Sequence, residues 1–99
     1  MYSIGIIQNG NSVRYAYINK DSGLLIKDVC GEYPSAWDNE KTADIIPKLK
    51  KATLLLESPE RYDYFTLDGW GGIDSVRASL LELIGLCEEY PDCKLGVDW

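Results

Sequence analysis

Residues 2–18, YSIGIIQNGNSVRYAYI, decide the fold of this chain. The runs 2–8 and 12–18 are rich in β-branched and aromatic residues, which are typical of strands. NGN stands between the two runs, and Asn-Gly is the strongest short hairpin signal because both residues accept a positive φ. The stretch therefore predicts a β-hairpin at the start of the chain.

The second strand of this hairpin is expected to present an aromatic face. Val13, Tyr15 and Tyr17 occupy alternate positions, and successive side chains of a strand point to opposite faces of a sheet. Ser12 falls on the other face in this pattern.

The middle of the chain predicts one more strand and a helix. After a turn at 19–23, the run LLIKDV (24–29) is interpreted as the third strand of an antiparallel meander. Asp44 is expected to cap the helix, which places Pro47 in its first turn, where the missing N–H costs nothing. A start as early as Asp38 would put Pro47 inside the helix, with a kink as the alternative. Ser58 precedes a proline and is expected to end this helix.

A second helix is predicted from Ile73, because its apolar residues lie along one broad stripe: Ile73, Val76, Leu80, Leu83, Ile84 and Cys87. YPD ends that helix, and KLGVDW (94–99) is expected to form the last strand. The predicted fold is therefore α+β, with residues 1–99 as a single domain. We expect two layers, an antiparallel β-meander plus a C-terminal strand packed by two helices, in the order βββααβ.

The composition argues against an enzyme. The chain has no histidine, which removes the commonest general base, the commonest metal ligand and every Ser-His or Cys-His pair. Three cysteines, Cys30, Cys87 and Cys93, have no zinc-ligand spacing and are expected to be reduced thiols, with Cys87 in a helix core. We expect no catalytic residues, no metal and no cofactor.

Charge and hydropathy limit the partners further. Residues 1–56 carry six acidic and seven basic residues, whereas residues 57–99 carry ten acidic and three basic residues. This negative charge repels phosphate backbones, so direct nucleic-acid binding is not expected. No apolar run is long enough to span a membrane, and we expect no secretory signal. We therefore expect a cytoplasmic protein with no membrane contact.

The glycine-rich stretch LDGWGG (67–72) precedes the second helix. It matches neither the phosphate-binding loop of nucleotide hydrolases nor the dinucleotide fingerprint. The N–H groups at a helix start favour anions, but Asp68 and Asp74 can satisfy the same groups and would repel a phosphate. A structural turn with Trp70 on the core is the first interpretation, and a protein-contact loop or a small-ligand site remains open.

The C-terminal half resembles a family of small proteins from phages and bacterial genomes that has no assigned chemistry. The resemblance lies in PERY (59–62), DGWG (68–71), the leucines of the second helix, Cys87 and YPD (90–92). Asp68 stands where the family usually has asparagine. The resemblance implies a phage or prophage origin and a shared α+β half.

These observations predict a protein that binds a partner and does not convert a substrate. Small acidic phage proteins often act by occluding a larger protein, and an acidic face suits a basic nucleic-acid channel. We therefore expect a non-enzymatic inhibitor of a host protein or defence complex, of the anti-CRISPR or anti-restriction kind, in the host cytoplasm. The predicted contact residues, with the aromatic ones as anchors, are Tyr62, Tyr64, Asp68, Trp70, Glu82, Glu88, Glu89 and Asp92.

Two other classes of function stay open. A nucleotide-binding, sponge-like protein would use the Gly-Trp loop to stack a base, with Arg61, Arg77 and Lys94 as the nearby basic residues. A structural subunit would form a homodimer through an exposed strand edge.

Overall fold

The computed structural model describes residues 2–57 and 72–98. Its first two strands, β1 (Tyr2–Gln8) and β2 (Asn11–Ile18), form the predicted hairpin. Asn9 and Gly10 have φ values of 53° and 81°. Two consecutive positive φ values define the two-residue turn that matches the twist of paired strands. The Asn-Gly signal in the sequence therefore identified the hairpin correctly.

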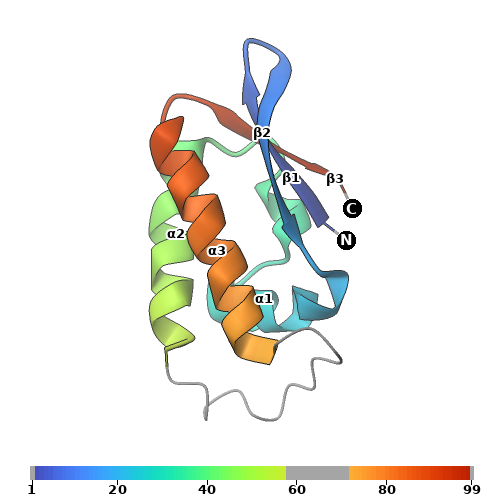
Figure 1. Cartoon of the computed structure of the whole chain (residues 1–99), viewed down its shortest axis with the longest axis vertical. Helices are drawn as coiled ribbons and strands as arrows, with labels where there is room; N and C mark the ends of the chain where they lie inside the picture. The colour runs from blue at the N-terminus through green and yellow to red at the C-terminus, as the bar shows by residue number, and fades with distance from the viewer. Residues whose placement is uncertain (1, 58–71, 99) are drawn as a thin grey trace.

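The sheet has three antiparallel strands in the order β2-β1-β3, with β3 formed by Lys94–Asp98 (Figure 1). The N-terminal strand is thus central, and the C-terminal strand pairs with it from Ser3↔Asp98 to Ile7↔Lys94. The predicted last strand is confirmed.

Residues 38–40, just before the helix that starts at Thr42, border β3 on its other side. The Asn39 N–H donates to the Leu95 carbonyl at 2.8 Å, and the Leu95 N–H donates to the Glu40 carbonyl at 2.9 Å. The Val97 N–H donates to Asp38 Oδ1 at 2.8 Å. This edge of the sheet is therefore hydrogen-bonded, whereas no other strand of the described chain pairs with the outer edge of β2.

The prediction of a third strand at 24–29 is wrong, because this segment lies within a helix, α1 (Gly23–Cys30). Leu25, Ile26 and Val29 are buried, which is the spacing of one helix face. Gly31 ends the helix with a φ of 84°, and its N–H donates to the Lys27 carbonyl at 2.8 Å. A glycine in this left-handed conformation is a common helix terminator.

The next helix, α2 (Thr42–Leu55), begins two residues before the predicted cap and ends before Ser58. Pro47 consequently lies inside the helix and not in its first turn. The proline is exposed, and so is Ala43, whose carbonyl would otherwise accept the missing bond. The kink-prone position thus faces solvent, where an unpaired carbonyl can be hydrated.

Thr42 explains the earlier start of α2. Its hydroxyl donates to the carbonyls of Tyr90 and Cys93, at 2.5 and 3.1 Å, and its N–H donates to the Cys93 carbonyl at 2.9 Å. Thr42 is fully buried. It therefore ties the first turn of α2 to the connection between the last helix and β3.

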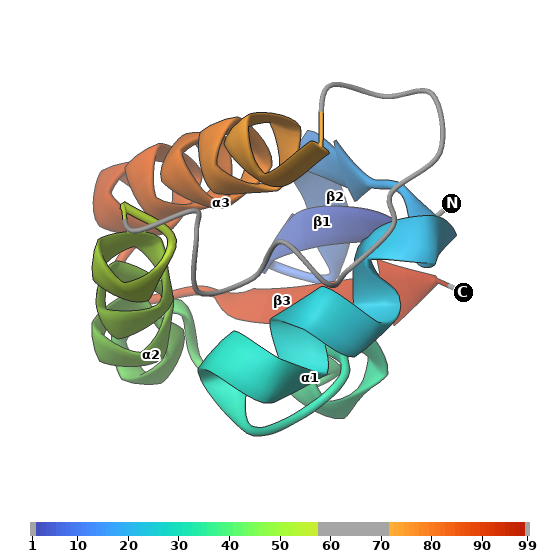
Figure 2. The same cartoon turned by 90° about the horizontal axis from the view of Figure 1, so that it is seen from below.

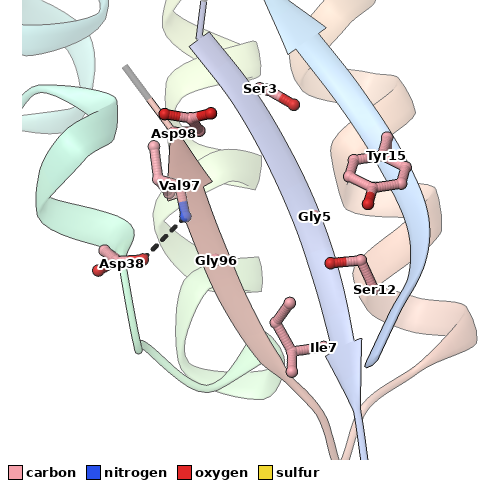
Figure 3. A pocket seen from close by; sticks show the side chains of 9 residues that line it. All are labelled: Ser3, Gly5, Ile7, Ser12, Tyr15, Asp38, Gly96, Val97 and Asp98. Carbon is pink, nitrogen blue, oxygen red and sulfur yellow. Dashed lines mark hydrogen bonds between the residues drawn. The ribbon is translucent and has the colours of Figure 1, made fainter. Parts of the chain in front are cut away.

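The last helix, α3 (Gly72–Glu89), begins within a residue of its predicted start. It runs antiparallel to α2, and both helices lie behind the sheet in Figure 3. The α+β class and the two-layer packing are confirmed, with the helical elements in the order α1, α2, α3 in place of a third strand and two helices. No helix in residues 2–57 and 72–98 is long and apolar enough to cross a membrane.

The core lies between the sheet and the helices. From the sheet it receives alternate residues of each strand, including Ile4 and Ile6, which are fully buried. From the helices it receives, among others, Leu49, Leu83 and Cys87, so the predicted place of Cys87 in a helix core is confirmed. One face of each strand is thereby committed to packing, which leaves the opposite face of the sheet for other contacts (Figure 2).

Candidate functional site

The outer face of the sheet carries residues that packing does not explain. The positions that alternate with the core residues are Ser3, Gly5, Ile7, Ser12, Tyr15, Tyr17, Lys94, Gly96 and Asp98. Glycine, serine and aspartate are disfavoured in strands, because they offer little surface to pack or compete for backbone hydrogen bonds. Their concentration on one face indicates a role other than stability.

Two glycines form the floor of a hollow on this face. Gly5 and Gly96 are directly opposite each other on β1 and β3 (Figure 3). A Cβ on Gly5 would lie 3.4 Å from Tyr15 Cε1, and a Cβ on Gly96 would lie 3.1 Å from Ile7 Cδ1. The missing side chains leave a hollow of about 310 Å³ whose walls are the neighbouring side chains.

A β-bulge brings Ser12 onto the wall of this hollow. The pairing of β1 with β2 shifts between Ile6↔Arg14 and Ile7↔Ser12, so Val13 is an extra residue. Ser12 therefore lies on the same face as Tyr15, and its Oγ is 3.4 Å from the Cβ position of Gly5. The predicted placement of Ser12 on the opposite face from Tyr15 is wrong, because strict alternation ignores the bulge.

The predicted aromatic face of β2 is present at Tyr15 and Tyr17, whereas Val13, predicted for the same face, packs partly against the core. Tyr15 and Tyr17 are 51% and 55% exposed, and their rings lie 6.5 Å apart with an angle of 15° between the planes. Large exposed aromatic side chains are enriched at protein interfaces, because they bury much area at a low entropy cost. Tyr15 lines the hollow and gives it an apolar border on the β2 side, and Tyr17 lies next to it.

Carboxylates border the hollow on the β3 side. Asp98 is exposed at the end of β3, and Asp38 is held in place by the N–H of Val97 (Figure 3). The nine residues that line the hollow include these two carboxylates, two serine hydroxyls and no basic side chain. The site is therefore suited to a cationic or hydrogen-bond-donating group.

The residues predicted as contacts from the sequence are only partly described. Tyr62, Tyr64, Asp68 and Trp70 lie outside the described residues, and so does most of the Gly-Trp loop. Glu82, Glu88, Glu89 and Asp92 are all exposed, on α3 or on the turn that follows it.

The two adjacent glutamates near the end of α3 face different neighbours. Glu88 Oε1 is 3.5 Å from Lys50 Nζ on α2, and Glu89 Oε1 is 4.0 Å from Arg14 Nη2 on β2. Arg14 also lies over the ring of Tyr90, with its Cζ 5.8 Å from the ring centroid. The basic residues of the N-terminal half thus offset part of the acidic C-terminal half in space.

Cys30 and Cys87 are poor nucleophiles. Burial raises the pKa of Cys87 to about 11, with a smaller contribution from Glu88. Burial, with a smaller contribution from Glu32, raises the pKa of Cys30 to about 12. Because the thiolate is the reactive form, both thiols are inert at neutral pH.

No protein-family model matches the chain, and no curated protein or solved structure is significantly similar to it. The resemblance to small phage and bacterial proteins therefore stays a prediction. The geometry and chemistry of the outer sheet face are the main basis for assigning a function.

Proposed function

We propose that this chain is a non-enzymatic binding protein that acts by covering a surface of another protein. The observation that carries the proposal is the outer face of the sheet, where the exposed Tyr15 borders a hollow with two glycines in its floor and the exposed Tyr17 stacks beside it. Such a mixture of aromatic, hydroxyl and acidic groups around a concave centre is typical of recognition surfaces rather than of packing.

A basic region of a protein is the preferred partner. The chain has a net charge of −6, and the hollow adds Asp38 and Asp98 to the contact face. Complementary charge speeds association and disfavours wrong partners. The same carboxylates would repel the phosphates of a nucleotide or a nucleic acid, which favours protein binding over the sponge-like alternative.

In its specific form, the proposal is that of a phage-type accessory protein in the host cytoplasm that inhibits a host protein or a defence complex. Support comes from the small size, the acidic composition and the resemblance of the C-terminal half to phage and prophage proteins. A nucleic-acid channel of such a complex is basic, and an acidic cover on it would exclude the nucleic acid.

Affinity capture from a bacterial lysate, with and without nuclease, tests the binding function. The wild-type chain is expected to retain a partner after nuclease treatment, because the contact is with protein. Replacing Tyr15 and Tyr17 together by serine should abolish the capture, whereas Leu54→Ser, which alters an exposed apolar residue on α2, should preserve it. Equal capture by both variants would place the contact elsewhere.

The acidic residues of α3 are the alternative surface at which the partner could be bound. Reversing the charges of Glu88 and Glu89 together is expected to weaken capture about tenfold at low salt if that end of α3 forms the contact. Unchanged affinity in this double variant, together with loss in the tyrosine variant, supports the sheet face.

A homodimer remains a separate prediction. The outer edge of β2 has no strand partner within the described chain and could pair with a second copy. Light scattering at increasing concentration tests it, and the tyrosine variant keeps the same backbone edge for comparison.

A further inference from the structure

We infer that the hollow on the outer sheet face seats a single arginine side chain of the partner protein. This inference rests on the binding function proposed above and names the chemical group that the site recognises. It depends on three properties of the hollow: a flat floor, an aromatic border and two carboxylates.

The floor is flat because Gly5 and Gly96 present only backbone. A Cβ on Gly5 would contact Tyr15 and Ser12, and a Cβ on Gly96 would contact Ile7. Gly5 is itself buried under Tyr15 and Ser12, and Gly96 is half-buried. A planar group can therefore lie beside Tyr15 over the backbone of Gly96, where a branched side chain would take up the space.

The aromatic border of the hollow favours a cation with a delocalised charge. Tyr15 stands at the hollow with about half of its surface exposed, so its ring is accessible to an incoming group. Guanidinium groups stack on aromatic faces and are more weakly hydrated than ammonium groups, so they lose less when water is removed. Arginine thus fits this border better than lysine does.

The carboxylates complete the match. The Val97 N–H donates to Asp38 Oδ1 at 2.8 Å, which fixes this carboxylate at the edge of the hollow. Asp98 stands on the same side of the hollow, and the hydroxyl of Ser12 points over β1 (Figure 3). A guanidinium carries five N–H donors in a fixed fork, which can reach several such acceptors at once.

The size of the hollow agrees with one side chain. About 310 Å³ is at the lower end of the range for pockets that hold small ligands. With no basic residue in its lining, nothing in the described chain competes for the two carboxylates from within the hollow. The partner is therefore expected to present one arginine from an extended or looped segment.

The test is an NMR titration of the full chain with three blocked peptides of the form Gly-Gly-X-Gly-Gly, in which X is arginine, lysine or citrulline. Citrulline has the shape of arginine without its charge. The arginine peptide is expected to shift the amide signals of Gly5, Gly96 and Val97 and to approach saturation. The lysine peptide should bind more weakly, and the citrulline peptide should leave these signals in place.

Paired variants locate the binding. Asp98→Asn and Gly5→Ala should each weaken arginine-peptide binding about tenfold, the first by removing a charged acceptor and the second by filling the floor. Glu82→Gln changes the net charge equally on α3, and Gly85→Ala adds a methyl group where no atom lies within 4 Å. Both controls should bind like the wild type. Since Asp98 is an exposed residue, its variant remains informative if Gly5→Ala does not fold.

Equal shifts with arginine and citrulline, shifts centred on α3, or no shifts at the outer sheet face would each overturn the inference. The lysate capture keeps the two proposals apart. A partner that is captured equally by the wild type, Asp98→Asn and Gly5→Ala would preserve the binding function and refute the arginine site. Specific arginine-peptide binding in the hollow without any captured protein would preserve the site and refute the proposed function.

Discussion

The inner and outer faces of the sheet are made by alternate residues of the same three strands, and they differ in almost every respect. The inner face carries six buried aliphatic side chains, Ile4, Ile6, Ala16, Ile18, Leu95 and Val97, together with the half-buried Tyr2 and the exposed Arg14. The outer face combines glycine, serine, tyrosine and aspartate around a hollow. Packing against the helices explains the buried residues of the inner face. It does not explain the outer-face residues around the hollow, which we therefore assign to recognition.

The two faces should differ most in stability at two neighbouring residues of β1. Ile6 is fully buried on the inner face, and Ile7 lies half-buried on the outer face. We expect Ile6→Ala to lower the free energy of unfolding by about 2–5 kcal/mol, because it leaves a cavity in the core. Ile7→Ala should cost about 1 kcal/mol, because part of its surface is already in water. Urea denaturation of both variants checks this, and equal losses would contradict the assignment of the two faces.

Thr42 tests whether a polar side chain on the packed side also contributes to stability. Thr42→Val keeps the shape but leaves the carbonyls of Tyr90 and Cys93 without the hydroxyl donor. We expect a loss of about 1–3 kcal/mol in the free energy of unfolding. Thr42→Ser retains the hydroxyl and should lose less. Equal stability of the valine variant and the wild type would show that the hydroxyl does not hold α2 to β3.

The cysteines of the packed side predict a pH dependence. Burial raises the pKa of Cys87 from 9.0 to about 11, so in the folded state its thiol stays neutral above the pH at which the unfolded thiol ionises. The unfolded state then binds fewer protons, and stability should fall as the pH rises from 9 towards 11. For this one group the slope approaches about 1.4 kcal/mol per pH unit. Urea denaturation of wild type and Cys87→Ala across this range measures the difference, and identical slopes would contradict the prediction.

Substitutions on the outer face should spare stability. Tyr15→Ser is expected to change the free energy of unfolding by about 0.5 kcal/mol, because the side chain is half exposed, while it weakens capture of the partner. Thermal unfolding and capture on the same preparation separate the two effects. A large loss of stability with unchanged capture would reverse the roles given to the faces.

The smallest effect is expected at the acidic end of α3. The pair between Glu88 and Lys50 is at the surface, with more than half of each side chain exposed. Glu88→Gln should therefore cost about 0.5 kcal/mol or less, and Glu82→Gln, at another exposed glutamate of the same helix, serves as the control. A loss several times larger would show that this pair is more than a surface contact.

Local signals made part of the fold predictable. The turn at Asn9 and Gly10 depends only on residues that accept positive φ, so the hairpin could be identified from two positions. The apolar stripe of α3 extends over several turns, which is long enough to distinguish a helix from a strand. The run 24–29 is too short for periodicity to separate a strand from a helix, and the useful signal was the glycine at 31.

The site depends on contacts that the sequence does not display. Gly5 and Gly96 meet only because the last strand pairs with the first, and Ser12 joins them only through the bulge. The charge division between the halves of the chain was correct as a count, but Lys50 and Arg14 come from the other half to face the α3 glutamates. Sequence patterns report residues that are near in the chain, whereas this surface combines both ends of it.

The most direct test of the central claim is chemical-shift mapping of the labelled chain bound to its captured partner. If the outer sheet face is the recognition surface, the largest changes will occur at Gly5, Tyr15 and Gly96, with smaller changes along α3. Changes concentrated at Glu88 and Glu89, with the three sheet residues unaffected, would contradict the claim.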